Sequence, residues 1–319
     1  MEKRHLKSIY IKKLTSKKTY SNQPEIIVIS SVIPAPTSAG EIILHRHLTQ
    51  AEDWTISIVP NPGQIKQRSA ISKLISIFSK TRLHAWINDF NVIACGQSWE
   101  NILSSQKPNS QNTIVLTVAH GDGCWAALRY AKKYDLPLVT IFHDWWPDIP
   151  LVHKRFRSLL NQRFIELYQN SDLAFCVSEE MKNTLGFHPN SHVLYPIPAE
   201  LPPGFKFEKT PQTNDSQPLK VLYFGSLYEY GALVAELLQK TKDHPFLQVQ
   251  IRGKNPNWSA KFRQEMSERN LWLDFAPRSQ LNKWLASADI LLVVMCFDSV
   301  MKRRMKTSFP SKLAEYAQF

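Results

Sequence analysis

The stretch TIVLTVAHGDGCWAALRYAKKYDLPLVTIFHDWWPD, residues 113–148, decides the fold class. It begins with an apolar run, Thr113–Ala119, that is typical of a buried strand. A segment with helical spacing, Cys124–Tyr134, comes next and ends shortly before Pro137, as a helix does when a proline follows. A second apolar run, Leu138–Phe142, predicts another strand. This order of strand, helix and strand predicts a parallel sheet covered by helices.

The same alternation continues on both sides of this stretch. Further strands are expected at Ile26–Ser30, Trp54–Val59, Leu173–Val177, His192–Leu194, Lys220–Phe224, Leu247–Ile251, Trp272–Phe275 and Ile290–Met295. Helices are expected at Gly40–Leu48, Leu151–Gln169, Ala232–Lys240, Ser259–Arg269, Ser279–Ser287 and from about Ser311. The pattern is interrupted once, where Pro196–Pro218 holds six prolines in 23 residues and predicts an interdomain linker.

We therefore expect an α/β protein with two domains. The expected parts are a flexible basic leader at 1–23, an N-terminal domain at 24–196, a Pro-rich linker at 197–218 and a C-terminal domain at 219–319. In parallel α/β folds, ligands bind at the carboxyl ends of the strands. The predicted functional site is accordingly an interdomain cleft.

The net charge of +12 is concentrated in two segments. Residues 1–20 contain seven Lys or Arg and one Glu, and Met301–Lys306 contains four Lys or Arg. Basic segments favour anionic partners. We expect residues 1–20 to contact an anionic membrane surface and residues 301–306 to help bind a diphosphate. No zinc-finger spacing or RNA-binding motif is present, so nucleic acid is not an expected partner.

Two further features limit the location of the protein. The longest unbroken apolar run, Ile290–Phe297, has eight residues, whereas a membrane-spanning helix needs about 20. The sequence starts without an apolar signal segment, and its four cysteines form no CxxC pair. These features predict reduced thiols in a cytoplasmic protein. With the expected membrane contact of residues 1–20, we expect it to work at the inner face of the membrane.

A cluster suited to carbohydrate chemistry follows the strand Leu138–Phe142. Its members are His143, Asp144, Trp145, Trp146, Pro147 and Asp148. Polar groups bond sugar hydroxyls, and indole rings cover the apolar faces of sugars. A metal site on His143, Asp144 and Asp148 is one alternative, although the spacing matches no strong metal pattern. A purely structural His143 is the other alternative.

The segment Thr307–Tyr316, TSFPSKLAEY, predicts a nucleotide site. Pro310 suits the first turn of a helix. Ser311 and Lys312 then lie at the helix N-terminus, where the dipole and free N–H groups favour phosphate. Glu315 follows one turn later, and its carboxylate can accept hydrogen bonds from both hydroxyls of a ribose. A solvated Lys/Glu pair on an ordinary helix is the alternative.

A third candidate is the loop Ser30–Gly40, which connects the first strand to a helix. Free N–H groups at the start of that helix can bind an anion or a sugar. The loop lacks the GxGxxG pattern, so no dinucleotide fingerprint is present.

With these motifs, the sequence resembles the retaining glycosyltransferases of family 4, which have the GT-B fold of two Rossmann-like domains. The resemblance covers most of residues 24–319. It is carried by Leu313–Ala317, which is similar to the end of the family's Glu-x7-Glu motif, and by residues 274–289, which are similar to the strand, loop and helix upstream of it.

The resemblance implies an activity and a set of site residues. The activity is transfer of a sugar from a nucleotide-diphosphate sugar to a glycan or lipid-linked acceptor, as in polysaccharide biosynthesis, without a metal or other cofactor. His143 is expected to contact the transferred sugar, with Asp144 beside it as a second catalytic residue. Donor-binding residues are expected at Gly40, Gly225, Ser226, Arg252, Ser311, Lys312, Leu313 and Glu315, the last on the ribose. Acceptor-binding residues are expected at Ala39, His120, Trp145 and Trp146.

The sequence departs from the family pattern at three places. Thr307 stands where the first glutamate of the motif is expected, and Ser226 and Tyr230 replace a basic pair. The chain ends at Phe319, within the helix that carries Glu315, so we expect an incomplete second domain. Replacement cations are expected among Arg252, Lys254, Lys302, Arg303, Arg304 and Lys312. These departures support an alternative function, that of a catalytically inactive, truncated relative that binds a nucleotide sugar or a partner protein.

Overall fold

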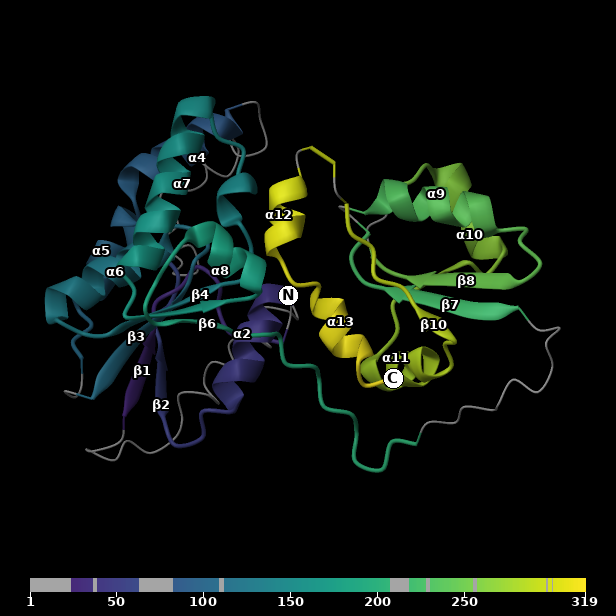
Figure 1. Cartoon of the computed structure of the whole chain (residues 1–319), viewed down its shortest axis with the longest axis horizontal. Coiled ribbons are helices and arrows are strands. Elements are labelled where there is room, and N and C mark those ends of the chain that lie inside the picture. Colours follow the sequence, from purple (N-terminus) through teal and green to yellow (C-terminus); the bar gives the residue numbers. More distant parts are fainter. Residues whose placement is uncertain are drawn as a thin grey trace. The chain divides into compact units, whose positions relative to one another are not determined.

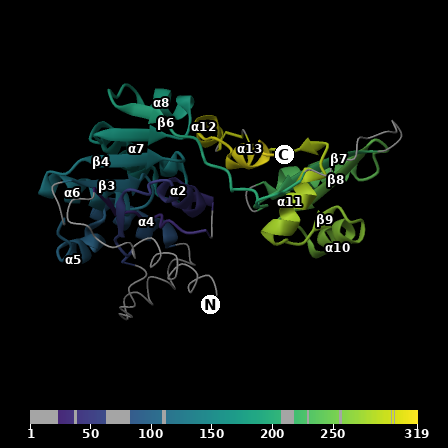
Figure 2. The same cartoon turned by 90° about the horizontal axis from the view of Figure 1, so that it is seen from below.

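The computed structural model describes residues 24–36, 39–62, 83–108, 112–206, 218–227, 230–254, 257–296, 298–299 and 301–319. The predicted leader, residues 1–23, lies outside the described residues. The chain divides into two compact units, the first formed by Met1–Ile197 and Lys306–Phe309 and the second by Pro198–Met305 and Pro310–Phe319. In both units, helices flank a parallel sheet (Figures 1 and 2).

The first unit is built on a six-stranded sheet in the order β2-β1-β3-β4-β5-β6. Its strands are β1 (Glu25–Val28), β2 (Thr55–Ile58), β3 (Thr113–Val118), β4 (Leu138–Phe142), β5 (Leu173–Cys176) and β6 (Ser191–Val193). All neighbouring pairs are parallel. The chain moves from β1 outward to β2 and then returns to the other side of β1 with β3. This reversal creates a topological switch point at the carboxyl ends of β1 and β3.

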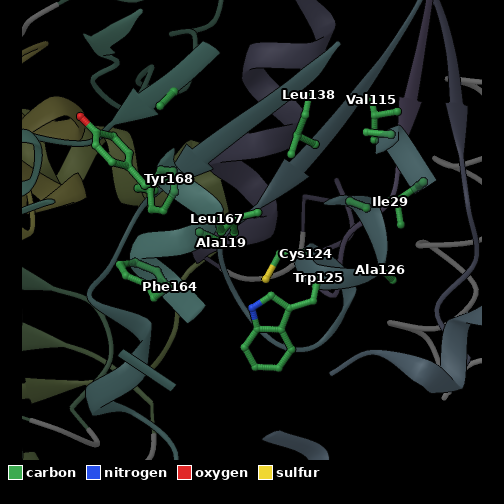
Figure 3. Close-up of a cluster of buried hydrophobic side chains, with 14 of the residues drawn as sticks. Ile29, Val115, Ala119, Cys124, Trp125, Ala126, Leu138, Phe164, Leu167 and Tyr168 are labelled. Carbon is green, nitrogen blue, oxygen red and sulfur yellow. The ribbon is translucent and has the colours of Figure 1, made fainter. Parts of the chain in front are cut away.

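Helices cover both faces of this sheet, which explains the continuous apolar runs of its strands. Alternate residues enter different cores: Ile27 and Ile29 pack with α4 to α8, whereas Ile26 and Val28 pack with α2. Figure 3 shows the first of these clusters, with side chains from the sheet, α6 and α7 drawn together. The helices are α2 (Ala39–Thr49), α4 (His84–Ala94), α5 (Glu100–Leu103), α6 (Gly123–Tyr134), α7 (Lys154–Gln169) and α8 (Glu179–Leu185), with short 3-10 turns η1 (Gln97–Trp99) and η2 (Trp146–Asp148).

The second unit has a four-stranded parallel sheet in the order β10-β7-β8-β9. Its strands are β7 (Leu219–Phe224), β8 (Leu247–Arg252), β9 (Trp272–Leu273) and β10 (Ile290–Leu291). Its helices are α9 (Gly231–Thr241), α10 (Ala260–Glu268), α11 (Arg278–Ala286) and α13 (Ser311–Tyr316). The residues of α12 (Lys302–Thr307) are divided between the units after Met305. The strand order reverses between β7 and β10, so this sheet also has a switch point.

The structure confirms the predicted alternation in both halves of the chain. The strands begin and end within a few residues of their expected positions, and the α/β fold with two Rossmann-like units is the GT-B architecture that the resemblance implied. All four cysteines are free thiols, with Cys124 and Cys176 buried and Cys95 and Cys296 half-buried. Burial raises the pKa of Cys176 to about 12, which keeps this thiol protonated and unreactive.

The segment Lys306–Phe309 belongs to the first unit, which the sequence pattern did not indicate. Ser178 holds it there, because its hydroxyl donates a hydrogen bond of 2.6 Å to the carbonyl oxygen of Thr307. The same oxygen of Ser178 caps α8 by accepting from the N–H of Met181. The ring of Phe309 lies 4.8 Å from that of Tyr195 and contacts the core of the first unit.

Candidate functional site

The switch point of the first unit is formed by two loops that touch closely. Gly121 has a φ of 71°, and a Cβ added there would lie 2.5 Å from the hydroxyl of Ser31, which follows β1. The N–H of Gly123 donates to the same hydroxyl at 3.0 Å, and the hydroxyl in turn donates to Asp122 at 3.2 Å. Asp122 also accepts from the indole N–H of Trp99. Glycine is therefore required at Gly121, where the two loops meet.

His143 lies at the carboxyl end of β4, next to this switch point. Its Nε2 atom is buried and has no hydrogen-bond partner among the described residues. Burial, together with the nearby His47 and His120, lowers the pKa of His143 to about 4. The imidazole is consequently neutral near pH 7, with one ring nitrogen available to a hydroxyl group. Buried polar atoms are usually paired, so an unpaired one indicates a ligand contact or an ordered water.

His47 is a second histidine of this cluster, and the sequence did not single it out. It lies in the last turn of α2, and its Nε2 atom is also buried without a hydrogen-bond partner in the part of the chain that the structure describes. Burial lowers the pKa of His47, although a backbone hydrogen bond at Tyr195 acts in the opposite direction. Only the proximity of β4 and α2 in the fold brings His47 and His143 together, so no sequence spacing could have revealed this pair.

The first prediction concerns the pH dependence of stability. The folded-state pKa of His143 is about 4, below the ordinary value of 6.5, so the unfolded chain takes up a proton first as the pH falls. This contribution to stability is complete above pH 6.5 and is lost as the pH falls towards 4, by at most about 3 kcal/mol. We expect His143→Gln to flatten this part of the curve, measured as the free energy of unfolding in urea. An unchanged slope in the variant would contradict the assignment.

The two tryptophans after β4 have different environments. Trp145 is 2% exposed, its indole N–H donates to Asn161 at 3.0 Å, and its ring packs against Phe164. Trp145 therefore packs in the core of the first unit, and its expected acceptor contact stays a prediction. Trp146 is half-buried and lies beside the rings of His120 and Trp125, at centroid distances of 5.7 and 5.6 Å.

The remaining predicted residues of the first unit lie around the same sheet edge. Asp144 is half-buried directly after His143. Ala39 and Gly40 begin α2, which follows β1. A Cβ at Gly40 would meet only Val32, at an ordinary contact distance of 3.8 Å. Among the described residues, no group of three His, Cys, Asp or Glu side chains is arranged to hold a metal ion.

In the second unit, Lys312 and Gly225 meet at the switch point. Gly225 follows β7 with a φ of 145°, and a Cβ there would lie 2.3 Å from Cε and 2.8 Å from Nζ of Lys312. The ammonium lies 5.1 Å from the ring centre of Tyr223 and 5.9 Å from that of Tyr230. Absence of a side chain at Gly225 thus allows Lys312 to reach the end of β7, where anions bind in such folds.

The short helix α13 is fixed so that Lys312 takes this position. The hydroxyl of Tyr316 accepts a hydrogen bond of 3.2 Å from the N–H of Phe224, and the two rings are in contact. Burial raises the pKa of Tyr316 to about 12, so the hydroxyl stays protonated. Because α13 has only six residues, its dipole is small and the charge at this site comes mainly from Lys312.

The second prediction tests this arrangement. Gly225→Ala is expected to displace Lys312 and to strain the backbone, because its Cβ would overlap the lysine side chain at a positive φ. Affinity for nucleoside diphosphates is expected to fall about tenfold by calorimetry, with an unfolding cost of about 1 to 2 kcal/mol. Gly204→Ala is the matched control, since Gly204 has a φ of 74° but nothing within 4 Å of the added Cβ. Equal affinities of the two variants would contradict the prediction.

Glu315 has a partner that the sequence did not indicate. Its carboxylate accepts a hydrogen bond of 2.8 Å from Nη2 of Arg278 in the first turn of α11, and its side chain is 13% exposed. Arg278 and Glu315 are 37 residues apart, so the pair depends on the packing of α11 against α13. The predicted ribose contact would have to share this carboxylate with Arg278. Arg278 is thus a positioning residue for Glu315.

The other predicted donor residues differ in their environments. Arg252 donates to the carbonyl oxygen of Asp274 at 2.7 Å, and its guanidinium lies over the ring of Trp284. Ser226 is exposed, and its carbonyl oxygen accepts from the hydroxyl of Tyr223. Ser311 is half-buried and Leu313 is exposed at the start of α13. The structure thus brings Lys312, Gly225 and Ser226 to the end of β7 and engages Arg252 in structural contacts.

The basic segment Met301–Lys306 has more than one environment. Lys302 and Arg303 are exposed on α12, whereas Met305 is buried. Lys306 pairs with Glu180 in the first turn of α8, with 2.6 Å between Nζ and Oε1. This pairing within the first unit reduces the charge that the segment can offer to a diphosphate.

Part of the first unit is similar to a known protein family. Residues 79–195 match the family model described as Glycosyltransferase Family 4. The matched range contains the predicted site residues His120, His143, Asp144, Trp145 and Trp146. The chain thus shares a family match over this range and the GT-B fold with glycosyltransferases.

Solved structures share the fold at low sequence identity. A sucrose-phosphate synthase from Thermosynechococcus elongatus is 12% identical with a TM-score of 0.50, covering 85% of this chain and 75% of its own. A UDP-glucosyltransferase from Polygonum tinctorium is 13% identical with a TM-score of 0.49, covering 91% of this chain and 78% of its own. No curated protein sequence matches the chain.

Proposed function

We propose that the protein transfers a sugar from a nucleotide-diphosphate sugar to a glycan or lipid-linked acceptor and retains the configuration at the anomeric carbon. The observation that carries this proposal is the buried, unpartnered Nε2 atom of His143. It lies at the carboxyl end of a central strand, within the range that matches the glycosyltransferase family. A neutral imidazole in this position suits a hydrogen bond to a sugar hydroxyl.

The second unit supplies the groups for the donor. The ammonium of Lys312 lies at the end of β7 and is suited to bind the diphosphate as a point charge. Glu315, held by Arg278, is the proposed acceptor of hydrogen bonds from the ribose hydroxyls. A positive charge at this position also stabilises the diphosphate as negative charge develops on it during transfer.

The proposed chemistry needs no resident metal or organic cofactor. The bond between the anomeric carbon and the diphosphate oxygen breaks, and its electron pair leaves with the diphosphate. The acceptor oxygen forms the new bond on the same face of the sugar, and its proton passes to the departing diphosphate. In this scheme His143 orients the sugar, Asp144 assists beside it, and Lys312 stabilises the leaving group.

A second function is favoured by specific residues and is kept as the alternative. Thr307 is 1% exposed and is engaged through its carbonyl oxygen by Ser178, so its side chain does not replace a catalytic glutamate. Tyr230 contributes a ring where the family has a cation. A protein with these features could bind a nucleotide sugar without turning it over. Donor binding without any release of nucleoside diphosphate would support this alternative.

The proposed partners include a membrane. No helix in the described part of the chain combines the length and the apolar character needed to cross a bilayer. Residues 1–20, the predicted contact with anionic headgroups, lie outside the described residues. We propose that the protein works in the cytoplasm at the inner face of the membrane, because a lipid-linked acceptor would be presented there.

The direct experiment is a donor panel. The protein is incubated with UDP-, GDP-, ADP- and dTDP-linked sugars, and release of the nucleoside diphosphate is followed with and without candidate glycan and lipid-linked acceptors. The proposal expects acceptor-dependent release with at least one donor. It also expects the product to keep the anomeric configuration of the donor, as read by NMR of the anomeric proton. An inverted product would contradict the proposed mechanism.

A further inference from the structure

Helix α4 presents an apolar stripe to solvent. Trp86, Phe90 and Ile93 are 59, 66 and 56% exposed, and they follow one another at helical spacing. Leu83 directly precedes the helix, three residues before Trp86, and is also exposed. Leu151 is exposed on the segment that leads into α7. Scattered apolar residues are common on surfaces, but a contiguous stripe that includes two large aromatic rings indicates an interaction surface.

The exposure of this stripe is not caused by a loose helix. The opposite side of α4 is buried through Asp89 and Val92. The carboxylate of Asp89 accepts from the backbone N–H of His153 at 3.0 Å and also contacts the imidazole ring of His153. The side-chain amide of Asn88 donates to the carbonyl oxygen of Leu151 at 2.9 Å. The helix is therefore fixed against α7, beside which it lies in Figure 1.

Positive charge lies beside the Trp86 end of the stripe. Lys154 and Arg155 are exposed in the first turn of α7, directly after His153, whose ring lies 5.0 Å from that of Trp86. Asp89 is the only acidic residue in the described segments 83–94 and 149–155, and it is buried. In the sequence, residues 63–82, which lead to α4, contain five Lys or Arg and no Asp or Glu.

We infer that the stripe formed by Leu83, Trp86, Phe90, Ile93 and Leu151 docks the first unit on an anionic lipid surface. Apolar and aromatic side chains enter the boundary between headgroups and acyl chains, and flanking cations bind the anionic headgroups. A second copy of the chain is a poorer occupant, because a symmetric contact across the stripe would bring Lys154 and Arg155 towards the same cations of the other copy. This surface differs from residues 1–20, the contact expected from the sequence.

The test is binding of the full chain to vesicles of phosphatidylcholine with phosphatidylglycerol, compared with phosphatidylcholine alone. The double variant Trp86→Ser/Phe90→Ser is expected to bind the anionic vesicles at least about tenfold more weakly. The reason is that the variant loses the free energy gained when the two aromatic rings move from water into the membrane interface. Phe187→Ser/Phe246→Ser is the matched control, since these two phenylalanines are at least as exposed on other surfaces. The control is expected to bind as the unchanged protein does. Lys154→Gln/Arg155→Gln is expected to reduce the difference in binding between vesicles with and without phosphatidylglycerol.

Three results would overturn the inference. The first is unchanged vesicle binding by Trp86→Ser/Phe90→Ser, which would leave residues 1–20 as the contact. The second is equal binding to vesicles with and without phosphatidylglycerol. The third is a concentration-dependent dimer in light scattering that the same double variant abolishes, which would identify a second copy as the occupant. Thermal unfolding of each variant shows whether it is folded, and the readout does not depend on sugar transfer.

Discussion

His143→Ala is expected to lower sugar transfer by about 10²-fold or more, while the affinity for the nucleoside diphosphate stays within about twofold. The physical reason is that the Nε2 atom of His143 is buried without a partner in the described structure and is available to orient a bound sugar. The diphosphate is assigned to residues of the second unit, so its binding is not expected to depend on this imidazole. Steady-state transfer and calorimetric titration of the nucleoside diphosphate measure the two quantities separately.

His192→Ala is the matched control for this variant. His192 lies exposed on β6 of the same unit, so its removal is expected to leave transfer unchanged. His143→Asn retains a hydrogen-bonding group and is expected to recover part of the lost rate. Full activity of His143→Ala would show that this histidine is structural and would remove the main support for the proposed site.

Lys312→Ala is expected to weaken binding of nucleoside diphosphates by about 10- to 100-fold, which corresponds to one charge-assisted contact of about 1.5 to 3 kcal/mol. The ammonium lies against Gly225 at the end of β7, and Ser226 and Tyr230 stand where the resemblance predicts a basic pair. Arg252 contacts Asp274 and Trp284, which makes it less available than Lys312 to bind the diphosphate. Calorimetry with the diphosphate and with the corresponding nucleoside separates phosphate from base and ribose binding.

The control for this variant is Lys240→Ala. Lys240 is exposed on α9 of the same unit, where it pairs with Glu236, and its removal changes the net charge by the same amount. If the loss is specific, Lys240→Ala binds normally and the nucleoside without phosphates binds equally to all variants. Equal loss in both lysine variants would indicate only a general effect of charge.

Much of the fold could be predicted because its strands are buried on both faces. Runs such as Thr113–Val118 and Leu138–Phe142 carry no charged residue and consist mainly of Ile, Val, Leu and Thr, without the alternation of polar and apolar residues of a half-exposed strand. Helix α4 was not predicted, since its exposed Trp86, Phe90 and Ile93 obscure the usual contrast between apolar and polar faces. Helix α8 was missed because it has only seven residues and depends on the cap supplied by Ser178.

Residues of the candidate site could be predicted only where a single short sequence segment contains them. His143 follows its strand directly, and Lys312 lies within a recognisable motif. Trp145 and Trp146 are adjacent in sequence, but only packing against Phe164 and Asn161 determines that the first is buried. The contacts of His47 and Arg278 connect distant segments, and sequence spacing does not record such contacts.

The central claim is that this chain turns over a nucleotide-diphosphate sugar. The most direct measurement is acceptor-dependent release of nucleoside diphosphate across the donor panel, made in parallel with the unchanged protein, His143→Ala and Lys312→Ala. The account predicts release with at least one donor, strongly reduced in His143→Ala by a lower maximal rate and in Lys312→Ala by weaker donor binding. Tight nucleotide binding without release from any donor would contradict the claim and leave the protein as a binding relative of the glycosyltransferases.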